Sequence, residues 1–410
     1  MTKAFPGNNI VSLLHLYRQQ MIEELRAIME YWILVTVDGK EGGFYGKIDH
    51  NNVIHRQADK GAVLNSRILW AFSAANNLER NIDISIMADR AYQYLADHFI
   101  DKEMGGLYWT VDHKGNPADT KKQTYATAFG IYALSEYYKN NPKEIVRTQA
   151  IDLYKSLLAH AYDSEYGGYL EAFARDWSEM PEIRLSAKDA NEKKSMNTHL
   201  HVLEAFANLY SIWPDIDLKN KIGELLGIFH KYIIDPGTFH LLLFFEKDWK
   251  VKSSLISYGH DIEAAWLLLE AAEIIGHKEY TSLYRLVGPQ MAKAASGGTD
   301  NNDGGLWYEY DPAADHWIRQ KHSWPQAEAM IGFFNAWQIT GDENMLQLSL
   351  NAWNFTTKFI KDPVLGEWVW GIHEDYSIMN EEDKVGVWKC PYHNSRACME
   401  IIKRIDSVLK

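Results

Sequence analysis

The sequence predicts an all-α protein, a single (α/α)6 barrel made of six helical hairpins with short β-hairpins at one end. Two observations support this fold. A Gly-Gly-aromatic signature recurs about every sixty to seventy residues, and apolar helical segments of two alternating kinds run between its copies. No Pro/Gly/Ser-rich linker interrupts the pattern, so residues 1–410 are predicted to form one domain.

The repeated signature has the chemistry of a tight turn followed by a short strand. In five copies an Asp lies four residues before the first glycine, and in the sixth copy it lies two residues before. Asp caps its own backbone, Gly accepts positive φ, and the aromatic residues that follow favour a strand. The copies begin at Gly42, Gly105, Gly167, Gly237, Gly304 and Gly366, of which those at Gly237 and Gly366 are degenerate. Each repeat should therefore run helix, turn, short hairpin, second helix.

The second helix of each repeat is predicted to lie in an inner ring. These segments are apolar at helical spacing, and most are rich in Ala, which suits close packing on all sides. They span residues 64–75, 125–138, 198–210, 261–274, 325–337 and 395–405. The segments at 82–99, 144–161, 218–234 and 345–360 are more amphipathic, as expected of an outer ring with one wet face.

The composition argues against several classes of partner. The formal net charge of −13 disfavours nucleic acid, because nucleic-acid binding depends on phosphate neutralisation by Lys and Arg. The first residues lack an apolar signal-peptide core, and no stretch is long enough to cross a membrane. With only two cysteines, Cys390 and Cys398, we expect a cytoplasmic monomer that acts on a neutral substrate. Some of the 15 Trp and 23 Tyr are candidate platforms for sugar rings.

Polar side chains cluster where the inner helices are predicted to begin. The repeat brings these starts to one mouth of the barrel, where helix N-termini favour negative charge. A lone His on an apolar helix is more often a core residue, but burying this many polar groups without a purpose would be costly. The residues are Asn65, Arg67, Tyr125, Asn197, His201, His260, Glu263, Trp324, Glu328, His393 and Arg396.

Two local spacings suggest how the histidines are arranged. His260 and Glu263 share a helix face, so Glu263 is predicted to accept a proton from one imidazole nitrogen and leave the other for substrate. A simple ion pair at the helix start is the alternative for this carboxylate. His199 and His201 are two residues apart and cannot both face the lumen. We place His201 in the site, one turn after Asn197, and predict a structural role for His199.

Metal and nucleotide sites are not predicted. His201, His260 and Glu263 could form a set of two histidines and one carboxylate. However, the sequence has no HExxH motif, no close Asp/Glu cluster and no Cys set with zinc spacing. The Gly-Gly pairs precede strands instead of opening helices, which is the wrong context for a phosphate-binding loop. We therefore expect catalysis without a metal and without a cofactor.

Five motifs distributed over most of the chain point to a known family. They are NSRILW at 65–70, NTHLH at 197–201, GHDIEAAW at 259–266, WPQAE at 324–328 and WKCPYHN at 388–394. The sequence resembles the N-acylglucosamine 2-epimerase superfamily from about residue 42 to 400, and most closely the cellobiose 2-epimerases. The last motif is the most specific for that branch.

The resemblance implies the fold, the activity and a set of site residues. It implies inversion of carbon 2 in the reducing-end glucose of β-1,4-linked disaccharides such as cellobiose, and of lactose or mannobiose as further candidates. His260 and His393 would be the catalytic residues, with His201 as an essential neighbour. The other implied contacts are Arg67, Tyr125, Asn197 and Glu263 around the reacting carbons, Trp324 and Trp388 against sugar rings, and Asp189 and Glu328 on sugar hydroxyls.

Inversion at carbon 2 requires an open-chain aldehyde, loss of the C–H proton and its return on the other face. A histidine with a pKa near 6.5 can serve as base and then as acid. The enediolate must be stabilised electrostatically, for which Arg67 is the cation and His201 and Asn197 supply hydrogen bonds. Our hypothesis is that His393 acts on one face and His260 on the other, with His260 or His201 assisting ring opening. Return of the proton to carbon 1 would give a ketose, so isomerase side activity is also expected.

Three other functions remain open at this point. A mannose isomerase or an N-acylglucosamine 2-epimerase would use the same scaffold. An inverting glycosidase would need two carboxyl groups across a glycosidic bond, and Glu263 and Glu328 are the candidates, but the histidines would then have no role. A non-catalytic sugar-binding module is the third possibility.

Overall fold

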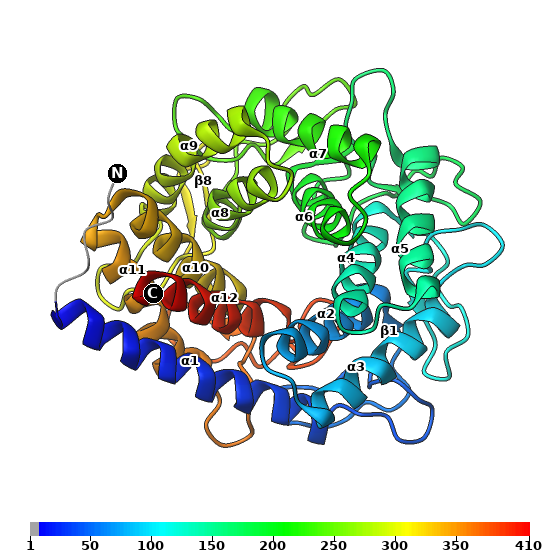
Figure 1. Cartoon of the computed structure of the whole chain (residues 1–410), viewed down its shortest axis with the longest axis horizontal. Coiled ribbons are helices and arrows are strands. Elements are labelled where there is room, and N and C mark those ends of the chain that lie inside the picture. The colour runs from blue at the N-terminus through cyan, green and yellow to red at the C-terminus, as the bar shows by residue number, and fades with distance from the viewer. Residues whose placement is uncertain (1–7) are drawn as a thin grey trace.

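The computed structural model describes residues 8–410, and two concentric rings of helices dominate it (Figure 1). The inner ring consists of α2 (Ala62–Leu78), α4 (Thr124–Asn140), α6 (Met196–Ile212), α8 (Tyr258–Ile274), α10 (Ser323–Thr340) and α12 (Tyr392–Leu409). The outer ring consists of α1 (Asn8–Leu34), α3 (Ile82–Tyr94), α5 (Glu144–Ser156), α7 (Ile216–Ile228), α9 (Lys278–Ser296) and α11 (Glu343–Phe355). The predicted (α/α)6 barrel is confirmed.

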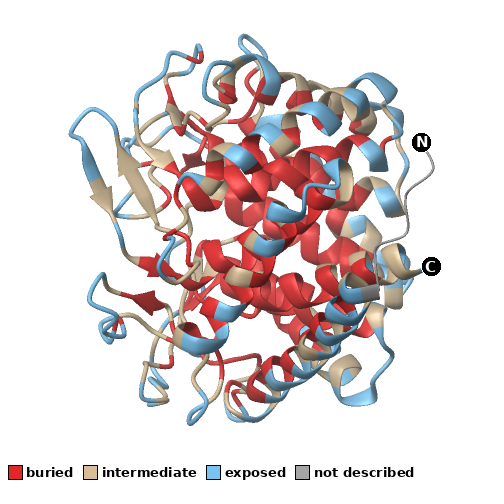
Figure 2. Ribbon diagram, turned by 90° about the vertical axis from the view of Figure 1, so that its left-hand side faces the viewer, coloured by how far each residue is buried: buried red, intermediate tan, exposed pale blue. Residues whose placement is uncertain are grey.

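The inner helices are buried on nearly every side, as their Ala-rich sequences predict. Each packs against the next around the ring, and α12 packs against α2, so the ring is closed. Figure 2 shows the buried residues concentrated in this ring, with exposed residues on the outer helices and loops. Four outer helices end in a π-helical turn, at Leu95–Phe99, Leu157–Ala161, Phe229–Ile233 and Thr356–Ile360. These turns continue the apolar pattern of the outer segments, which explains why the predicted segments extend beyond the α-helical parts.

Short antiparallel strands gather at one end of the barrel (Figure 2). A strand that leads into an inner helix pairs with a strand of the next repeat, so neighbouring hairpins are linked around the rim. The pairs are β1 (Lys60–Gly61) with β2 (Thr110–Val111), β3 (Lys122–Gln123) with β4 (Ala172–Phe173), β5 (Lys194–Ser195) with β6 (Phe244–Phe245), and β10 (Lys321–His322) with β11 (Gly371–Ile372). The remaining sheet has three strands, β7 (Ile256–Ser257), β8 (Glu309–Asp311) and β9 (His316–Ile318).

The Gly-Gly turns have the predicted chemistry. In the third repeat, the Asp163 side chain accepts the backbone N–H of Glu165 at 3.0 Å and that of Tyr166 at 3.4 Å. Gly168 has a φ of 78°, and a Cβ there would lie 2.5 Å from the His199 ring. Glycine is therefore required by both the backbone conformation and the space.

A buried lysine fastens five of the six turns, a feature that we did not predict. Lys60 Nζ lies 2.9 Å from Asp38 Oδ2 and 2.8 Å from the carbonyl oxygen of Gly42. In four of the five pairs the lysine follows its aspartate by 21 or 22 residues, a spacing that is visible in the sequence. The other pairs are Lys122–Asp101, Lys194–Asp163, Lys321–Asp300 and Lys384–Asp362. The fourth repeat has Ile256 at the first position of its strand, where most others have the lysine.

Breaking one of these ion pairs is expected to destabilise the protein substantially. Lys60→Met should cost about 3 kcal/mol, because it leaves the buried Asp38 carboxylate without its cation. Lys47→Met is the matched control, since Lys47 pairs with Asp383 at 3.1 Å but is 43% exposed, and should cost under about 1 kcal/mol. Urea denaturation would measure both. Equal losses in the two variants would contradict this account of the turns.

His199 has the structural role that we predicted for it. Its Nε2 accepts the backbone N–H of Tyr169 at 2.9 Å, and its Nδ1 lies 2.7 Å from the carbonyl oxygen of Ser195. Asp261 and Gln326 bind the backbone N–H groups of their own hairpins in the same way, at 2.8 and 2.7 Å. Burial lowers the pKa of His199 to about 3, so the ring is neutral and joins the helix to the hairpin through its hydrogen bonds.

None of the helices within residues 8–410 combines the length and the apolar character that crossing a membrane would require.

Candidate active site

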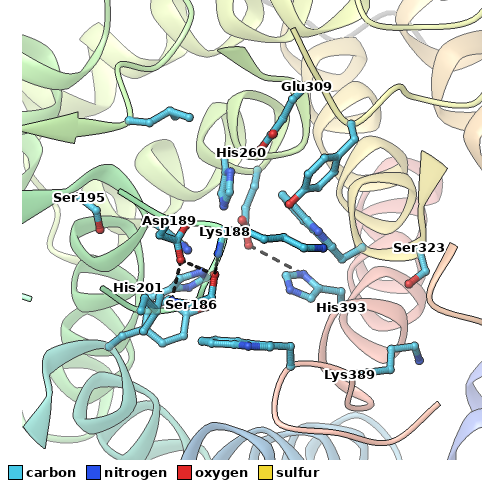
Figure 3. Close-up of a pocket in the computed structure, with 18 of the residues that line it drawn as sticks. Ser186, Lys188, Asp189, Ser195, His201, His260, Glu309, Ser323, Lys389 and His393 are labelled. Carbon is cyan, nitrogen blue, oxygen red and sulfur yellow. Dashed lines mark hydrogen bonds and ion pairs between the residues drawn. The ribbon is translucent and has the colours of Figure 1, made fainter. Parts of the chain in front are cut away.

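A cavity of about 400 Å³ opens at the end of the barrel where the inner helices begin (Figure 3). Eight of the eleven residues predicted at the helix starts line it, so most of them converge at one mouth as predicted, and Asp189 and Trp388, which the resemblance implied, line it too. They are Arg67, Tyr125, Asp189, Asn197, His201, His260, Glu263, Trp324, Trp388 and His393. Glu328 is fully buried and is not among the lining residues.

His260 and His393 both pack against one indole ring. The Trp324 ring centroid is 4.7 Å from that of His260 and 5.5 Å from that of His393. Figure 3 shows His260, His201 and His393 around one shared space, with His201 across from His393. Imidazoles thus approach one volume from different directions.

The predicted pairing of His260 with Glu263 is wrong. His260 Nδ1 instead lies 2.8 Å from the hydroxyl oxygen of Ser257, the last residue of β7, immediately before α8. Glu263 accepts a hydrogen bond from Arg396, so its carboxylate is turned toward α12. The alternative prediction for Glu263, an ion pair at the start of its helix, is closer to the structure, although the partner Arg396 belongs to a different helix. His260 has only a hydroxyl behind it and no carboxylate.

His393 and His201 are each backed by a carboxylate. His393 Nδ1 lies 2.7 Å from Glu328 Oε1, and His201 Nδ1 lies 3.0 Å from Glu204 Oε2. A carboxylate at Nδ1 fixes the proton on that nitrogen and leaves Nε2 for the cavity. The predicted contact of Glu328 with sugar hydroxyls is contradicted by its position, because the carboxylate lies behind His393. Glu204 was missed, although its spacing of three residues from His201 was a usable signal.

Arg396 joins these carboxylates beneath the cavity floor. Its Nη2 donates to Glu263 and, at 2.7 Å, to Glu328, while its Nη1 donates to Glu204 and to the Tyr392 hydroxyl. Burial and the nearby Glu328 raise the pKa of Glu263. Three carboxyl groups thus share one guanidinium, and the excess of negative charge favours a proton on this cluster.

This arrangement bears on two of the alternatives. Among the residues that the structure describes, the one group of three potential metal ligands is Glu263, Glu328 and His393, with ligand atoms within 4.8 Å of one another. Arg396 already donates to both of these carboxyl groups, and the expectation of a metal-free reaction stays a prediction. Because both carboxyls bind the same guanidinium nitrogen, they do not flank a glycosidic bond, and the proposed glycosidase pair is wrong.

Arg67 is a buried cation that faces the cavity without a carboxylate partner. Only 3% of the residue is exposed, and within residues 8–410 no acidic side chain lies within 4.0 Å of it. Its Nη2 donates to the Tyr125 hydroxyl at 2.8 Å, and the guanidinium lies 4.2 Å from the Phe129 ring centroid. A buried guanidinium of this kind is poised for negative charge that develops in a ligand.

Part of the cavity lining comes from segments outside the inner helices. Asp189, which the resemblance implied as a contact, accepts hydrogen bonds from the backbone and hydroxyl of Ser186, so it is held by its own loop. Lys188 lies 3.7 Å from Glu382. Glu309 of β8, which no motif revealed, also lines the cavity, and burial together with Asp189 raises its pKa to about 7. Figure 3 shows Asp189 beside Ser186, and Glu309 above His260 in this view.

Aromatic rings and one free amide complete the site. Trp388 packs at 5.7 Å from Trp109 and 5.9 Å from Tyr125, measured between ring centroids, so its orientation is fixed. Asn197 lines the cavity, and its buried Oδ1 has no hydrogen-bond partner among the described residues. A polar atom left open at a cavity wall is suited to a ligand hydroxyl.

The pKa shifts predict an unusually acidic lower limit for activity. Burial is the main cause that lowers the pKa of His201, His260 and His393, with His260 at about 3. A general base works when neutral, so activity is lost only as pH falls through the folded-state pKa. We expect the acid limb of kcat/KM to lie at least about one pH unit below 6.5. Initial rates, with circular dichroism to confirm folding, would test this, and a midpoint at 6.5 or above would contradict it.

Comparison with known proteins finds relatives of similar length and fold. Residues 43–397 match the family model for N-acylglucosamine 2-epimerase (GlcNAc 2-epimerase). A cellobiose 2-epimerase from Bacteroides fragilis is 44% identical over 386 residues, which cover 94% of this chain and 98% of the relative. The solved cellobiose 2-epimerase of Bacillus thermoamylovorans B4167 has a TM-score of 0.88 at 36% identity, over 94% of this chain and 100% of that chain. That of Spirochaeta thermophila DSM 6192 has a TM-score of 0.92 at 32% identity, over 98% and 100%.

Proposed function

The chain belongs to the N-acylglucosamine 2-epimerase family, and on this premise we propose that it inverts carbon 2 of the reducing-end glucose in β-1,4-linked disaccharides such as cellobiose. Membership makes it a carbohydrate epimerase. The observation that carries the finer proposal is that His260 and His393 both pack against Trp324 and line one cavity, which also holds an unpaired guanidinium.

The reaction begins with opening of the sugar ring. Because both imidazoles are neutral in the free enzyme, His260 can take the proton of the anomeric hydroxyl, and water supplies a proton to the ring oxygen. His260 then carries a positive charge, and carbon 1 is an aldehyde. The aldehyde acidifies the proton on carbon 2.

His393 then removes the carbon-2 proton and becomes an imidazolium, which Glu328 stabilises through Nδ1 at 2.7 Å. The electron pair moves into the enediolate, whose oxygen faces the charge of Arg67. His260 returns its proton to carbon 2 on the opposite face. His393 gives its proton to oxygen 1 as the ring closes, and the ring oxygen returns one to water. Both imidazoles end neutral, as they began.

Incorporation of solvent deuterium at carbon 2 of the product provides the test. In deuterium oxide, the product should carry deuterium at carbon 2, because the returned proton originates from an exchangeable hydroxyl. The experiment incubates the protein with cellobiose, without added metal, and analyses the product by NMR. Product that retains its original hydrogen at carbon 2 would indicate an intramolecular hydride shift and would overturn this mechanism.

The size of the cavity favours a disaccharide over a single sugar. Its volume is about 400 Å³, and its lining includes Ser186, Asp189 and Glu309 as well as the histidines, so a monosaccharide would leave part of it empty. We therefore expect cellobiose to react faster than free mannose or N-acetylmannosamine. Turnover of these monosaccharides without turnover of cellobiose would support a mannose isomerase or an N-acylglucosamine 2-epimerase, and binding without turnover would support a sugar-binding module.

We also infer a cytoplasmic setting and a monomeric state. Cys390 and Cys398 are both buried and free, as a reducing compartment favours. Size-exclusion chromatography with light scattering would measure the oligomeric state directly.

A further inference from the structure

We propose that Glu171 is a positioning residue for the active site, because its carboxylate fixes the first turn of α6 from a buried place outside the cavity. The inference rests on the proposed function, since it takes Asn197 and His201 of α6 to act on the reacting carbons.

Glu171 holds the starts of two neighbouring inner helices at once. Its carbonyl oxygen accepts the backbone N–H of Thr124, the first residue of α4, at 3.0 Å. Its side chain accepts the backbone N–H of Ser195 and the hydroxyl of Thr198, each at 2.7 Å, at the start of α6. These helices carry Tyr125 and His201, whose rings meet edge to face at 5.0 Å in the active site.

The side-chain contact breaks the symmetry of the barrel. Trp109, Leu243 and Trp370 occupy the equivalent place in other repeats, and their carbonyl oxygens accept the N–H of an inner helix in the same way. Leu243 and Trp370 send their side chains to the wall of the main cavity. Only at Glu171 is this side chain a carboxylate directed beneath a helix start, so repeat packing alone does not explain it.

The carboxylate is costly to bury. Glu171 is 3% exposed, and no Lys, Arg or His lies within 4.0 Å of it in the described part of the chain. Its two short hydrogen bonds and the positive end of the α6 dipole are its compensation. Burial raises its pKa to about 7.

The Glu171 side chain holds the segment that carries Asn197. Ser195 and Thr198 bracket this residue, and Glu171 and Asn197 share a small hollow beside the main cavity. The Asn197 Oδ1 atom has no partner among the described side chains, so its position depends on the backbone that Glu171 anchors. Displacement of such a group by a fraction of an ångström is enough to slow a reaction.

The experiment compares Glu171→Gln and Thr198→Val with wild type. The substrate is whichever of cellobiose, mannose and N-acetylmannosamine the wild-type protein converts fastest. Each variant is expected to lower kcat about tenfold while KM changes less than about twofold. The double variant should lose little more, because both changes break the same contact. The ratio of epimerised to ketose product should also shift, which a purely structural change would not cause.

Glu192→Gln is the matched control. Glu192 lines the same hollow but has no hydrogen bond to α6, so this variant should retain wild-type kcat. If Glu171→Gln fails to fold, Thr198→Val decides the question, because it removes one hydroxyl and leaves the carboxylate in place. Wild-type kcat and product ratio in Thr198→Val would overturn the inference. Wild-type turnover of cellobiose tests the proposed function separately.

Discussion

Replacing His393 with glutamine is expected to lower kcat on the order of 10³-fold, with little change in KM. The imidazole removes the carbon-2 proton, and glutamine can fill its place beside Trp324 and Glu328 without acting as a base. Steady-state rates with cellobiose would measure the loss. His55→Gln is the control, because His55 is 44% exposed and pairs only with Asp49 at the surface.

The same variants also distinguish the two faces of the sugar carbon. His260→Gln also loses its ring-opening base, so its substrate must come from the slow uncatalysed opening of the sugar. On that open form His393 should still exchange the carbon-2 hydrogen of one epimer with deuterium from solvent, without converting it to the other. His393→Gln should show the complementary behaviour with the other epimer. Exchange of both epimers by a single variant would mean that one imidazole serves both faces, and would refute the division of labour proposed above.

Replacing Arg67 with methionine is expected to lower kcat about 10²- to 10³-fold. The guanidinium is buried beside the cavity with no acidic partner, so its charge remains available for the enediolate. Methionine keeps the packing against Phe129 and Tyr392 but removes that charge. The loss should appear mainly in kcat, because the substrate is neutral and the charge develops only during reaction.

Arg67→Lys and Arg319→Met serve as comparisons for this variant. Lysine retains a point charge without the planar fork, so it should recover part of the lost rate. Arg319 lies on the surface, 46% exposed beside Glu374, and its loss should leave kcat unchanged. If Arg67→Met raised KM and left kcat intact, Arg67 would bind ground state and transition state alike, and its role in stabilising the enediolate would be excluded.

The architecture was predictable because its signals are local and repeated. An Asp that caps its own turn, glycines with positive φ, and Ala-rich helical segments each follow from a few adjacent residues. Repetition at one period then placed the helix starts at one mouth of the barrel, and eight of the eleven residues predicted there do line the cavity. The buried lysine that pairs with the Asp of five turns was overlooked because Lys is seldom expected inside a protein.

The side-chain partners were less predictable, because they depend on how neighbouring helices rotate. Glu263 shares a helix with His260 but binds Arg396, which is 133 residues away. Glu328 was taken for a sugar contact, although it lies behind His393, 65 residues away. Sequence spacing orders the residues along one helix and does not say which neighbour fills the gap between two helices. Asp189 comes from a loop and Glu309 from the short strand β8, where no helical periodicity applies.

The sixth helical pair joins the two ends of the described chain, since α1 packs on α12. Arg18 binds Asp406 at 2.6 Å, and Glu24 accepts the indole N–H of Trp368 at 2.7 Å. A chain emerging from the ribosome can stack five helical pairs while its last helix is still unmade, but it then lacks both His393 and Arg396. The ring and its chemistry are thus completed in one final docking step. Deletion of α1 or of α12 should consequently abolish turnover outright instead of reducing it gradually.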